Sequence, residues 1–331
     1  MRRLPRSLAL IALSAFVTPG VLSGQASLDP DLLARCRAIG LPMERQALCQ
    51  DVIMAAQLVQ PELGLALAGG NPVLGTASPI GTKFRFIPRV YLGGRMNFVW
   101  GEIPDILNYP ENPTEPTGSV GFSVTMIQLD ASVGVFDGFK LGATTGGLAS
   151  VELLGSLGTM ILPAGAGFEN DVAGFGLGAR IGLLRESFTA PGISFSGEYH
   201  WTGRIRYGDV RQGDDAQFGL DLGVASFRAG ISKSFVAIGL AFTLGWDHYT
   251  SDVDFGVADA DGDLVAVVPE SAPIGLSSDR WSAFFDVSYI VLFFNIAAEL
   301  GWQETETLVT SRGDDLESGN FFGAIGIRLS M

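Results

Sequence analysis

The chain of 331 residues contains no long apolar run after its first 26 residues, and only 17% of its residues are charged. A membrane-spanning helix needs about 20 consecutive apolar residues, so the rest of the chain offers no such helix. The mean hydropathy is nevertheless +0.32. A chain this apolar that has no spanning helix must alternate apolar with polar residues. A closed β-barrel is then the remaining architecture that can cross a bilayer.

Positive charge and cysteine are also scarce. Lys and Arg number 21 against 35 Asp and Glu, a net charge of −14, which argues against nucleic acid as a partner. Metal binding by the two cysteines, Cys36 and Cys49, is the weaker interpretation of their presence. In an oxidising compartment we expect them to form a disulfide worth about 3 kcal/mol. We expect no cofactor.

The first 26 residues have the features of a secretory signal. Arg2, Arg3 and Arg6 precede an apolar stretch over residues 8–17, and small residues at Gly24 and Ala26 permit cleavage after Ala26. The apolar stretch is too short for a spanning helix, which disfavours an uncleaved anchor. We therefore expect export through the inner membrane.

Apolar and polar residues alternate with period two from about residue 82 to the end of the chain. Segment 192–208 is the clearest, with aromatic residues near both ends of its apolar face, and it is longer than most globular strands. These features are typical of a barrel wall that faces lipid on one side. Its apolar face holds Ile193, Phe195, Gly197, Tyr199, Trp201, Gly203, Ile205 and Tyr207.

We count about ten such segments, an even number as expected for a bacterial barrel. The alternation changes parity once near Met126 and once near Ala225, which predicts β-bulges there. The segments cover residues 82–101, 118–136, 147–161, 171–185, 192–208, 216–233, 236–251, 279–290, 293–304 and 319–331.

The lengths of the connections support one orientation. Odd-numbered connections are long and polar, and most even-numbered ones are short. Outer-membrane barrels have short periplasmic turns and longer external loops, so both ends of the barrel segment should lie in the periplasm. We therefore predict a single antiparallel barrel over residues 81–331, with 8–14 strands possible.

Residues 27–80 do not alternate. Asp29 and Pro30 favour the start of a short helix over 30–39, and a second helix is expected from about 43 to 59, ending before Pro61. This helical segment, joined by the Cys36–Cys49 disulfide and expected on the periplasmic side, would act either as a plug or as a periplasmic tether without a gating role.

The signal, the helical segment, Gly69-Gly70-Asn71-Pro72 and the amphipathic strands together resemble bacterial outer-membrane β-barrel proteins. Met331 stands where such proteins typically end in Phe or Trp, so recognition by the barrel-assembly machinery is implied less directly. A looser likeness is to the long-chain fatty acid transporters, which carry an Asn-Pro-Ala motif in an N-terminal hatch. Here Asn71 and Pro72 match and Val73 does not, and that family has more strands; the likeness hints at transport of hydrophobic solutes.

Many charges are expected to face the lumen. Because unpaired buried charges are costly, a mutually neutralising network is favoured over an anion-selective channel of the kind that charged rings produce. Asp130, Glu152 and Asp221 are further acids on this face. The predicted lumen-lining residues are Arg85, Arg89, Arg95, Arg180, Glu198, His200, Arg204, Arg206, Asp286, Glu299 and Arg328.

Catalytic and metal sites are weakly indicated. Asp247 and His248 are adjacent in a strand and should face opposite sides, so they would not cooperate, and we predict no enzyme. Acids in the fourth long connection follow the spacing of a Ca²⁺ loop, but Leu264 replaces the glycine that this loop requires. The weak calcium candidates are Asp259, Asp261, Asp263 and Glu270.

The sequence thus favours a non-enzymatic outer-membrane barrel, acting as a narrow pore or transporter for small or hydrophobic solutes. The alternative is a structural or adhesive barrel with a blocked lumen and external loops that bind partners. An outer-membrane hydrolase is a remote third reading. The expected partners are outer-membrane lipid, lipopolysaccharide and the barrel-assembly machinery, with no nucleic acid.

Overall fold

The computed structural model describes residues 27–83, 87–110, 112, 114–140, 142, 146–169, 171–259, 261–292, 294–319 and 321–330. Ten long antiparallel strands form a closed barrel, as predicted. They are β3 (Val90–Pro104), β4 (Ser119–Phe136), β5 (Ser150–Ile161), β6 (Val172–Leu184), β7 (Gly192–Thr202), β9 (Ala216–Phe235), β10 (Ile238–Ala258), β12 (Ile274–Val291), β13 (Phe294–Gln303) and β16 (Phe321–Ser330).

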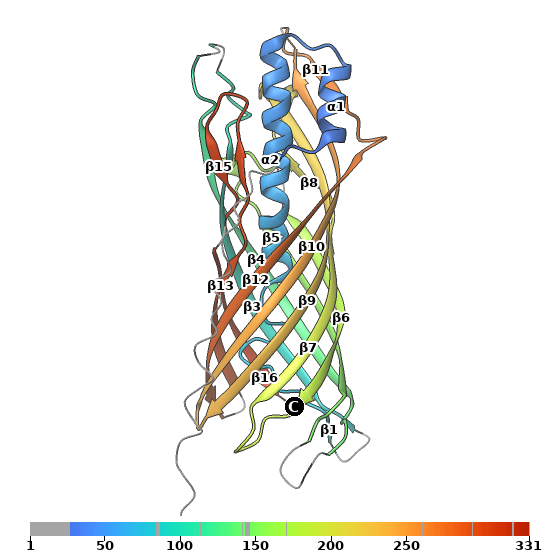
Figure 1. Cartoon of the computed structure of the whole chain (residues 1–331), viewed down its shortest axis with the longest axis vertical. Coiled ribbons are helices and arrows are strands. Elements are labelled where there is room, and N and C mark those ends of the chain that lie inside the picture. Colours follow the sequence, from blue (N-terminus) through green and yellow to red (C-terminus); the bar gives the residue numbers. More distant parts are fainter. Residues whose placement is uncertain are drawn as a thin grey trace, which may run out of the picture.

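Each of these ten strands pairs with the next one along the chain, and pairing of β16 with β3 closes the barrel. Two short connections join β9, which ends at Phe235, to β10, which begins at Ile238, and β12, which ends at Val291, to β13, which begins at Phe294. They lie at the same end as the C-terminus, together with the longer connection between β4 and β5, while the other long connections lie at the opposite end (Figure 1). By the usual rule for barrels the first end is periplasmic and the second is external.

Short elements complete the wall and the connections. Strands β8 and β11 extend the main sheet at the external end, and β14 pairs with β15 in a separate hairpin. These elements are β1 (Thr82–Lys83), β2 (Ile87–Pro88), η1 (Ala164–Ala166), β8 (Ile205–Tyr207), η2 (Val210–Gln212), β11 (Leu264–Val268), β14 (Thr307–Val309) and β15 (Asp315–Glu317).

Strand β10 shows how the wall is divided along its length. From Ile238 to Trp246 the outward side chains are apolar, and this stretch of about nine residues matches the 9–11 that a tilted strand needs to cross the hydrocarbon layer. Beyond Trp246 the outward side chains are polar, beginning with His248, while Tyr249 and Phe255 point inward and are buried. The barrel therefore has a membrane half with a polar interior and an external half, here called the tower, with an apolar interior.

The change from a polar to an apolar interior explains why the two predicted β-bulges, near Met126 and Ala225, are wrong. The register of β4 with β3 is continuous through Met126, and that of β9 with β10 is continuous through Ala225, so neither position has a bulge. The buried positions keep one parity across both places. The apolar residues change sides because the surroundings change from lipid outside to an apolar core inside, and the backbone stays regular.

Between β7 and β8 the opposite occurs. The strand is interrupted at Gly203 and Arg204, and the buried face changes from even-numbered positions up to Thr202 to odd-numbered ones at Ile205 and Tyr207. The predicted continuous strand over 192–208 is therefore wrong beyond residue 202. The interruption of the strand shifts the inward-facing positions by one residue, and the barrel interior changes from polar to apolar at the same place. The two changes cancel in the sequence, so the alternation shows no break.

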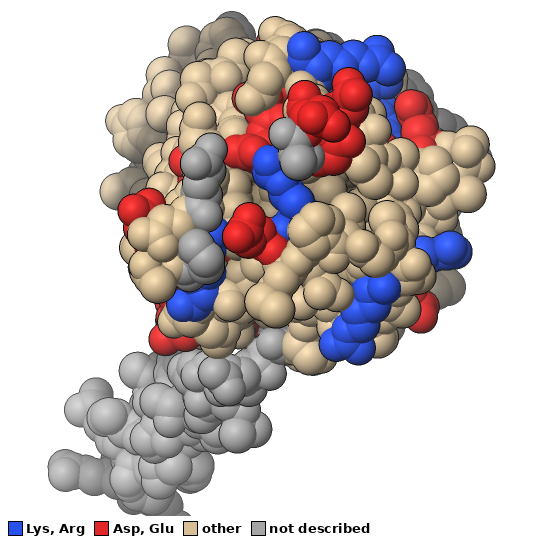
Figure 2. Space-filling view, turned by 90° about the horizontal axis from the view of Figure 1, so that it is seen from above, with Lys and Arg blue, Asp and Glu red and all other residues tan. Residues whose placement is uncertain are grey.

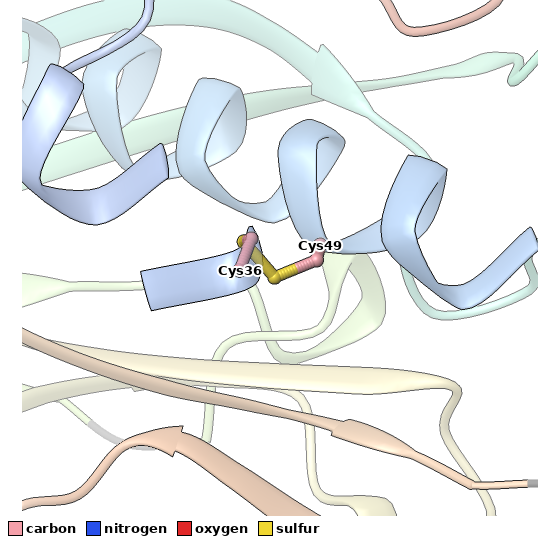
Figure 3. Close-up of a disulfide and its surroundings, with 2 residues drawn as sticks. All are labelled: Cys36 and Cys49. Atoms are coloured by element: carbon pink, nitrogen blue, oxygen red, sulfur yellow. A yellow bond between two sulfur atoms is a disulfide. The ribbon is translucent and has the colours of Figure 1, made fainter. Parts of the chain in front are cut away.

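The helical hairpin, α1 (Pro30–Ala38) and α2 (Met43–Ala68), lies at the external end, and α2 descends inside the tower (Figure 1). The expected Cys36–Cys49 disulfide joins the helices, with a Cα–Cα distance of 6.0 Å (Figure 3). The expectation that these helices lie on the periplasmic side is wrong, because the buried apolar surface of α2 matches the apolar interior of the tower. Neither helix among the described residues has the length and apolar character needed to cross a bilayer.

Helix α2 is also longer than expected, since Pro61 lies inside it and does not end it. An internal proline normally costs about 3 kcal/mol. All of the helix from Leu58 to Ala68 is buried, and this enclosure offsets the loss of one helical hydrogen bond. The helix ends where Gly69 adopts a φ of 67°.

Candidate functional site

Residues 69–81, here called the lumenal segment, pass from the lower end of α2 through the membrane half of the barrel. The segment has no helix or strand, so its backbone groups need partners on the barrel wall. Its glycines allow a close approach to that wall. A Cβ on Gly70 would collide with the Glu299 carboxylate, and one on Gly75, whose φ is +79°, would lie 2.8 Å from Ser288 Cβ.

Arginines on the wall donate to the carbonyls of the lumenal segment. The Arg228 guanidinium donates to Gly69 O at 2.9 Å and to Gly70 O at 3.0 Å. Arg95 donates to Asn71 O at 3.1 Å. The further bonds of this kind are Arg328 to Leu74 O, Arg180 to Thr76 O and Ser78 O, Arg185 to Pro79 O, and Arg89 to Ile80 O.

Wall carboxylates accept from the amides of the same segment. Asn71 N–H donates to Glu299 at 2.8 Å, and Gly75 N–H donates to Asp286 at 2.9 Å. Ile80 N–H donates to Glu152, which also pairs with Arg180. The lumenal charges thus hold an irregular backbone in place as well as neutralising one another.

The upper part of α2 is bound to two external connections through one carboxylate. Asp51 accepts from Tyr109 Oη and Thr117 Oγ1, each at 3.0 Å, and from the backbone N–H of Ser311 at 2.7 Å. Burial raises the pKa of the Asp51 carboxyl above its ordinary value, and these donors oppose that rise. Asp51 therefore holds the connections between β3 and β4 and between β14 and β15 against the helix.

Further contacts join the helix to the same connections. Arg45 forms an ion pair of 2.8 Å with Asp215, whose other carboxylate oxygen accepts from Tyr109 N–H at 2.9 Å. The Arg312 guanidinium lies 4.4 Å from the centre of the Tyr109 ring. Figure 2, which looks down on this end, shows acidic and basic side chains next to one another near the middle of the face. We call this end, formed by the helical hairpin and the external connections, the crown.

Most of the predicted lumen-lining residues face the interior, and two do not. Arg85 lies outside the described residues. Arg206 is exposed, and Arg204 contacts Asp221 and Asp254 on the outer face of the tower. The prediction that Arg204, Arg206 and Asp221 line the lumen is wrong because of the changes of face and surroundings described above.

The two histidines lie in different environments. His200 is 1% exposed inside the barrel, its ring nitrogens have no hydrogen-bond partner among the described residues, and Glu198 lies 4.0 Å away. His248 faces outward and contacts Asp279 at 2.9 Å, whereas Asp247 is buried inside and pairs with Arg228. Asp247 and His248 therefore share no cleft.

The acids of the calcium template do not converge. The Asp259 carboxylate accepts from the backbone N–H groups of Asp261 and Asp263, each at 2.9 Å, and so forms part of a turn. Glu270 lies 3.8 Å from Arg206. Within the part of the chain that the structure describes, no group of three or more His, Cys, Asp or Glu is arranged to hold a metal ion.

A cavity of about 30 Å³ lies in the membrane half beside Leu74, Arg95 and Arg328, with room for about one or two water molecules. Ten closed antiparallel strands, an apolar outer band and short turns at one end are the features of bacterial outer-membrane proteins. The protein is an outer-membrane β-barrel.

Comparisons with solved structures give barrels of this kind at low similarity. The translocator domain of the autotransporter NalP from Neisseria meningitidis has a TM-score of 0.40 and 12% identity, over 84% of this chain and 97% of that one. The transport unit of the autotransporter AIDA-I from Escherichia coli has a TM-score of 0.33 and 10% identity, over 82% and 98%. The P. putida toluene transporter TodX has a TM-score of 0.31 and 10% identity, over 81% and 94%.

No protein-family model matches the chain, and no curated protein matches it. Structural similarities at this level carry no information about function. The likeness to fatty acid transporters still depends on Asn71 and Pro72, which lie in the lumenal segment, and it stays a prediction.

Proposed function

We propose that this protein is a non-conducting outer-membrane barrel that acts through its crown. The observation that carries the proposal is that α2 fills the tower and the lumenal segment fills the membrane half. This corresponds to the structural or adhesive alternative, with the crown as the surface that meets partners. We assign no catalytic role to any residue.

The energy needed to displace the lumenal segment supports a closed state. Among the residues that the structure describes, eleven hydrogen bonds join charged wall residues to the backbone of this segment. Bonds to charged groups contribute about 1.5–3 kcal/mol each. If only about half of them contribute at the lower value, displacement costs on the order of 8 kcal/mol, which corresponds to an open fraction of roughly one in a million.

Conductance in planar bilayers tests the proposal. The wild-type protein should show no steady single-channel steps after insertion. The variant that lacks residues 27–80 should show steps, because neither α2 nor the lumenal segment then obstructs the barrel. The variant with Arg95→Ala and Arg228→Ala loses three carbonyl bonds to the lumenal segment but keeps α2 in the tower, so it should stay silent. Steps from the deletion variant would establish that the protein inserts, and steady steps from the wild type would refute the proposal.

Gated transport of small or hydrophobic solutes is a second candidate, favoured by one observation. The segment that crosses the membrane half is irregular, so it can change conformation without unfolding a helix. Uptake of a hydrophobic solute by cells expressing the wild type, above that of cells lacking the protein, would favour this candidate. Uptake that appears only when residues 27–80 are deleted would favour the closed barrel.

A further inference from the structure

A hollow of about 480 Å³ lies on the outer face of the tower, across β7, β9, β10 and β12. The strand register places it relative to the membrane. Trp246 has Phe227 and Trp281 as cross-strand neighbours, and these aromatic residues mark the external edge of the apolar band. The hollow begins four residues further out along β10, at Thr250, so it faces the headgroup layer of the outer leaflet.

The hollow exists because glycines take wall positions where larger side chains would normally stand. Gly223 and Gly275 lie on either side of β10, opposite Thr250 and Asp252. A Cβ on Gly275 would meet nothing within 4 Å, and one on Gly223 would collide with the Tyr199 hydroxyl, which reaches across it. Glycine within a strand weakens it and often marks the close approach of another molecule.

Aromatic rings form one side of the hollow. Tyr199 and Trp201 stack with ring centres 6.1 Å apart, and Phe175 stacks with Trp201 with ring centres 6.0 Å apart. Tyr199 is 50% exposed, and Trp201 is 37% exposed. Rings held in this way offer an apolar edge with a hydroxyl at its end.

Polar groups form the floor and the opposite side. Asp221 and Asp252 are direct cross-strand neighbours, an arrangement of like charges that is unfavourable by itself. Arg204 contacts Asp221 at 3.3 Å. Among the described residues, no hydrogen-bond partner is present for the side chains of Asp252 and Ser277 or for the Tyr199 hydroxyl, so these groups are available to a ligand.

We propose that this hollow binds the saccharide headgroup of a glycolipid in the outer leaflet. Sugars present apolar ring faces and many hydroxyl groups, which match an aromatic wall beside carboxylate and hydroxyl acceptors. The acyl chains of the same lipid would lie against Phe227, Trp246 and Trp281 below. The acidic floor favours sugars that are neutral or carry amines over sugars rich in phosphate.

The test compares two tryptophan substitutions at open glycines of the tower. Gly275→Trp fills the hollow. Gly121→Trp is the matched control, because Gly121 is exposed on β4 and a Cβ there meets only one atom, at 4.0 Å. Glycolipid bound per protein is measured by native mass spectrometry after mild detergent extraction, and heat-dependent mobility on gels checks that each barrel is folded.

The wild type and Gly121→Trp should retain glycolipid equally, and Gly275→Trp should retain about tenfold less, a change of about 1.4 kcal/mol. Asp252→Ala, which adds no bulk, should also lower retention. Equal retention in all four proteins would overturn the proposal.

A competition experiment identifies the source of the ligand. Free headgroup oligosaccharide should displace intact glycolipid from the wild type at high concentration. Failure to compete would show that only acyl chains are bound. Binding of the free oligosaccharide as tight as that of the glycolipid would place the ligand in the medium. Either result would refute the assignment.

Discussion

Replacement of Arg228 by Met removes the contact that fixes the junction between α2 and the lumenal segment. The guanidinium is 3% exposed and pairs with Asp247 at 2.8 Å, in addition to its bonds to Gly69 O and Gly70 O. Met has a similar length and no donors. The substitution therefore leaves two carbonyls and one carboxylate without their strongest partner, at nearly constant volume.

The expected loss follows from the buried carboxylate. Breaking a buried ion pair by removing one partner typically costs about 3–5 kcal/mol. Because the barrel wall and the tower core remain intact, this loss should appear as local opening of residues 69–76. Hydrogen exchange there should accelerate by roughly a hundredfold to a few thousandfold, and amides of β9 and of the upper part of α2 should be unchanged.

Hydrogen exchange with mass spectrometry in detergent measures this directly. Arg206→Met is the control, because Arg206 is exposed on the tower, and it should leave residues 69–76 protected. Adding Asp247→Leu to Arg228→Met should restore part of the protection, since the unpaired carboxylate is then removed. Protection within threefold of wild type in the single variant would refute the role given to Arg228.

Three further outcomes are expected. An epitope inserted before Leu28 should be accessible to antibody on intact cells, because the described chain begins beside Gln57 in the tower; access only after permeabilisation would contradict the orientation. Replacing Cys36 and Cys49 by Ser should destabilise the helical hairpin by about 3 kcal/mol, seen as faster exchange in α1, and unchanged exchange would show that the disulfide is dispensable. Burial raises the pKa of Asp51, so the folded protein holds this proton more tightly than the unfolded chain does. Attachment of the external connections to α2 should therefore be strongest below the ordinary carboxyl pKa and should weaken as pH rises through the raised pKa. Measured as protease resistance against pH, this profile should be flatter in Asp51→Asn. An equally steep profile in the variant would assign the effect to another group.

The sequence predicts the wall well because period-two alternation and the lengths of the connections depend on the backbone alone. The ten strands and the Cys36–Cys49 pairing agree with the structure. Alternation does not, however, say which face is inside. That assignment assumes one set of surroundings along the whole strand, and here the surroundings invert near Met126 and Ala225.

The lumenal contacts are less accessible to sequence reasoning. Arg95 was predicted to neutralise acids, and Arg228 was not among the predicted lumen-lining residues. Both also donate to carbonyls of a segment distant in the sequence. The length of the predicted strands was a sign of this arrangement, since segments 216–233 and 236–251 already exceed the 9–11 residues that a bilayer requires, and β9 and β10 have 20 and 21 residues. Where such strands extend beyond the membrane, the barrel interior needs an apolar element to fill it, and α2 is the longest remaining apolar element.

The tower also sets a distance. Twelve residues of β10 follow Trp246, and at about 3.3 Å per residue with a tilt near 40° they rise about 30 Å above the aromatic edge. Loops attached directly at the bilayer would lie among the sugars of neighbouring lipids. A hydrogen-bonded cylinder with a helix at its centre instead works as a stiff spacer, so whatever meets the crown would do so at a fixed height above the cell surface.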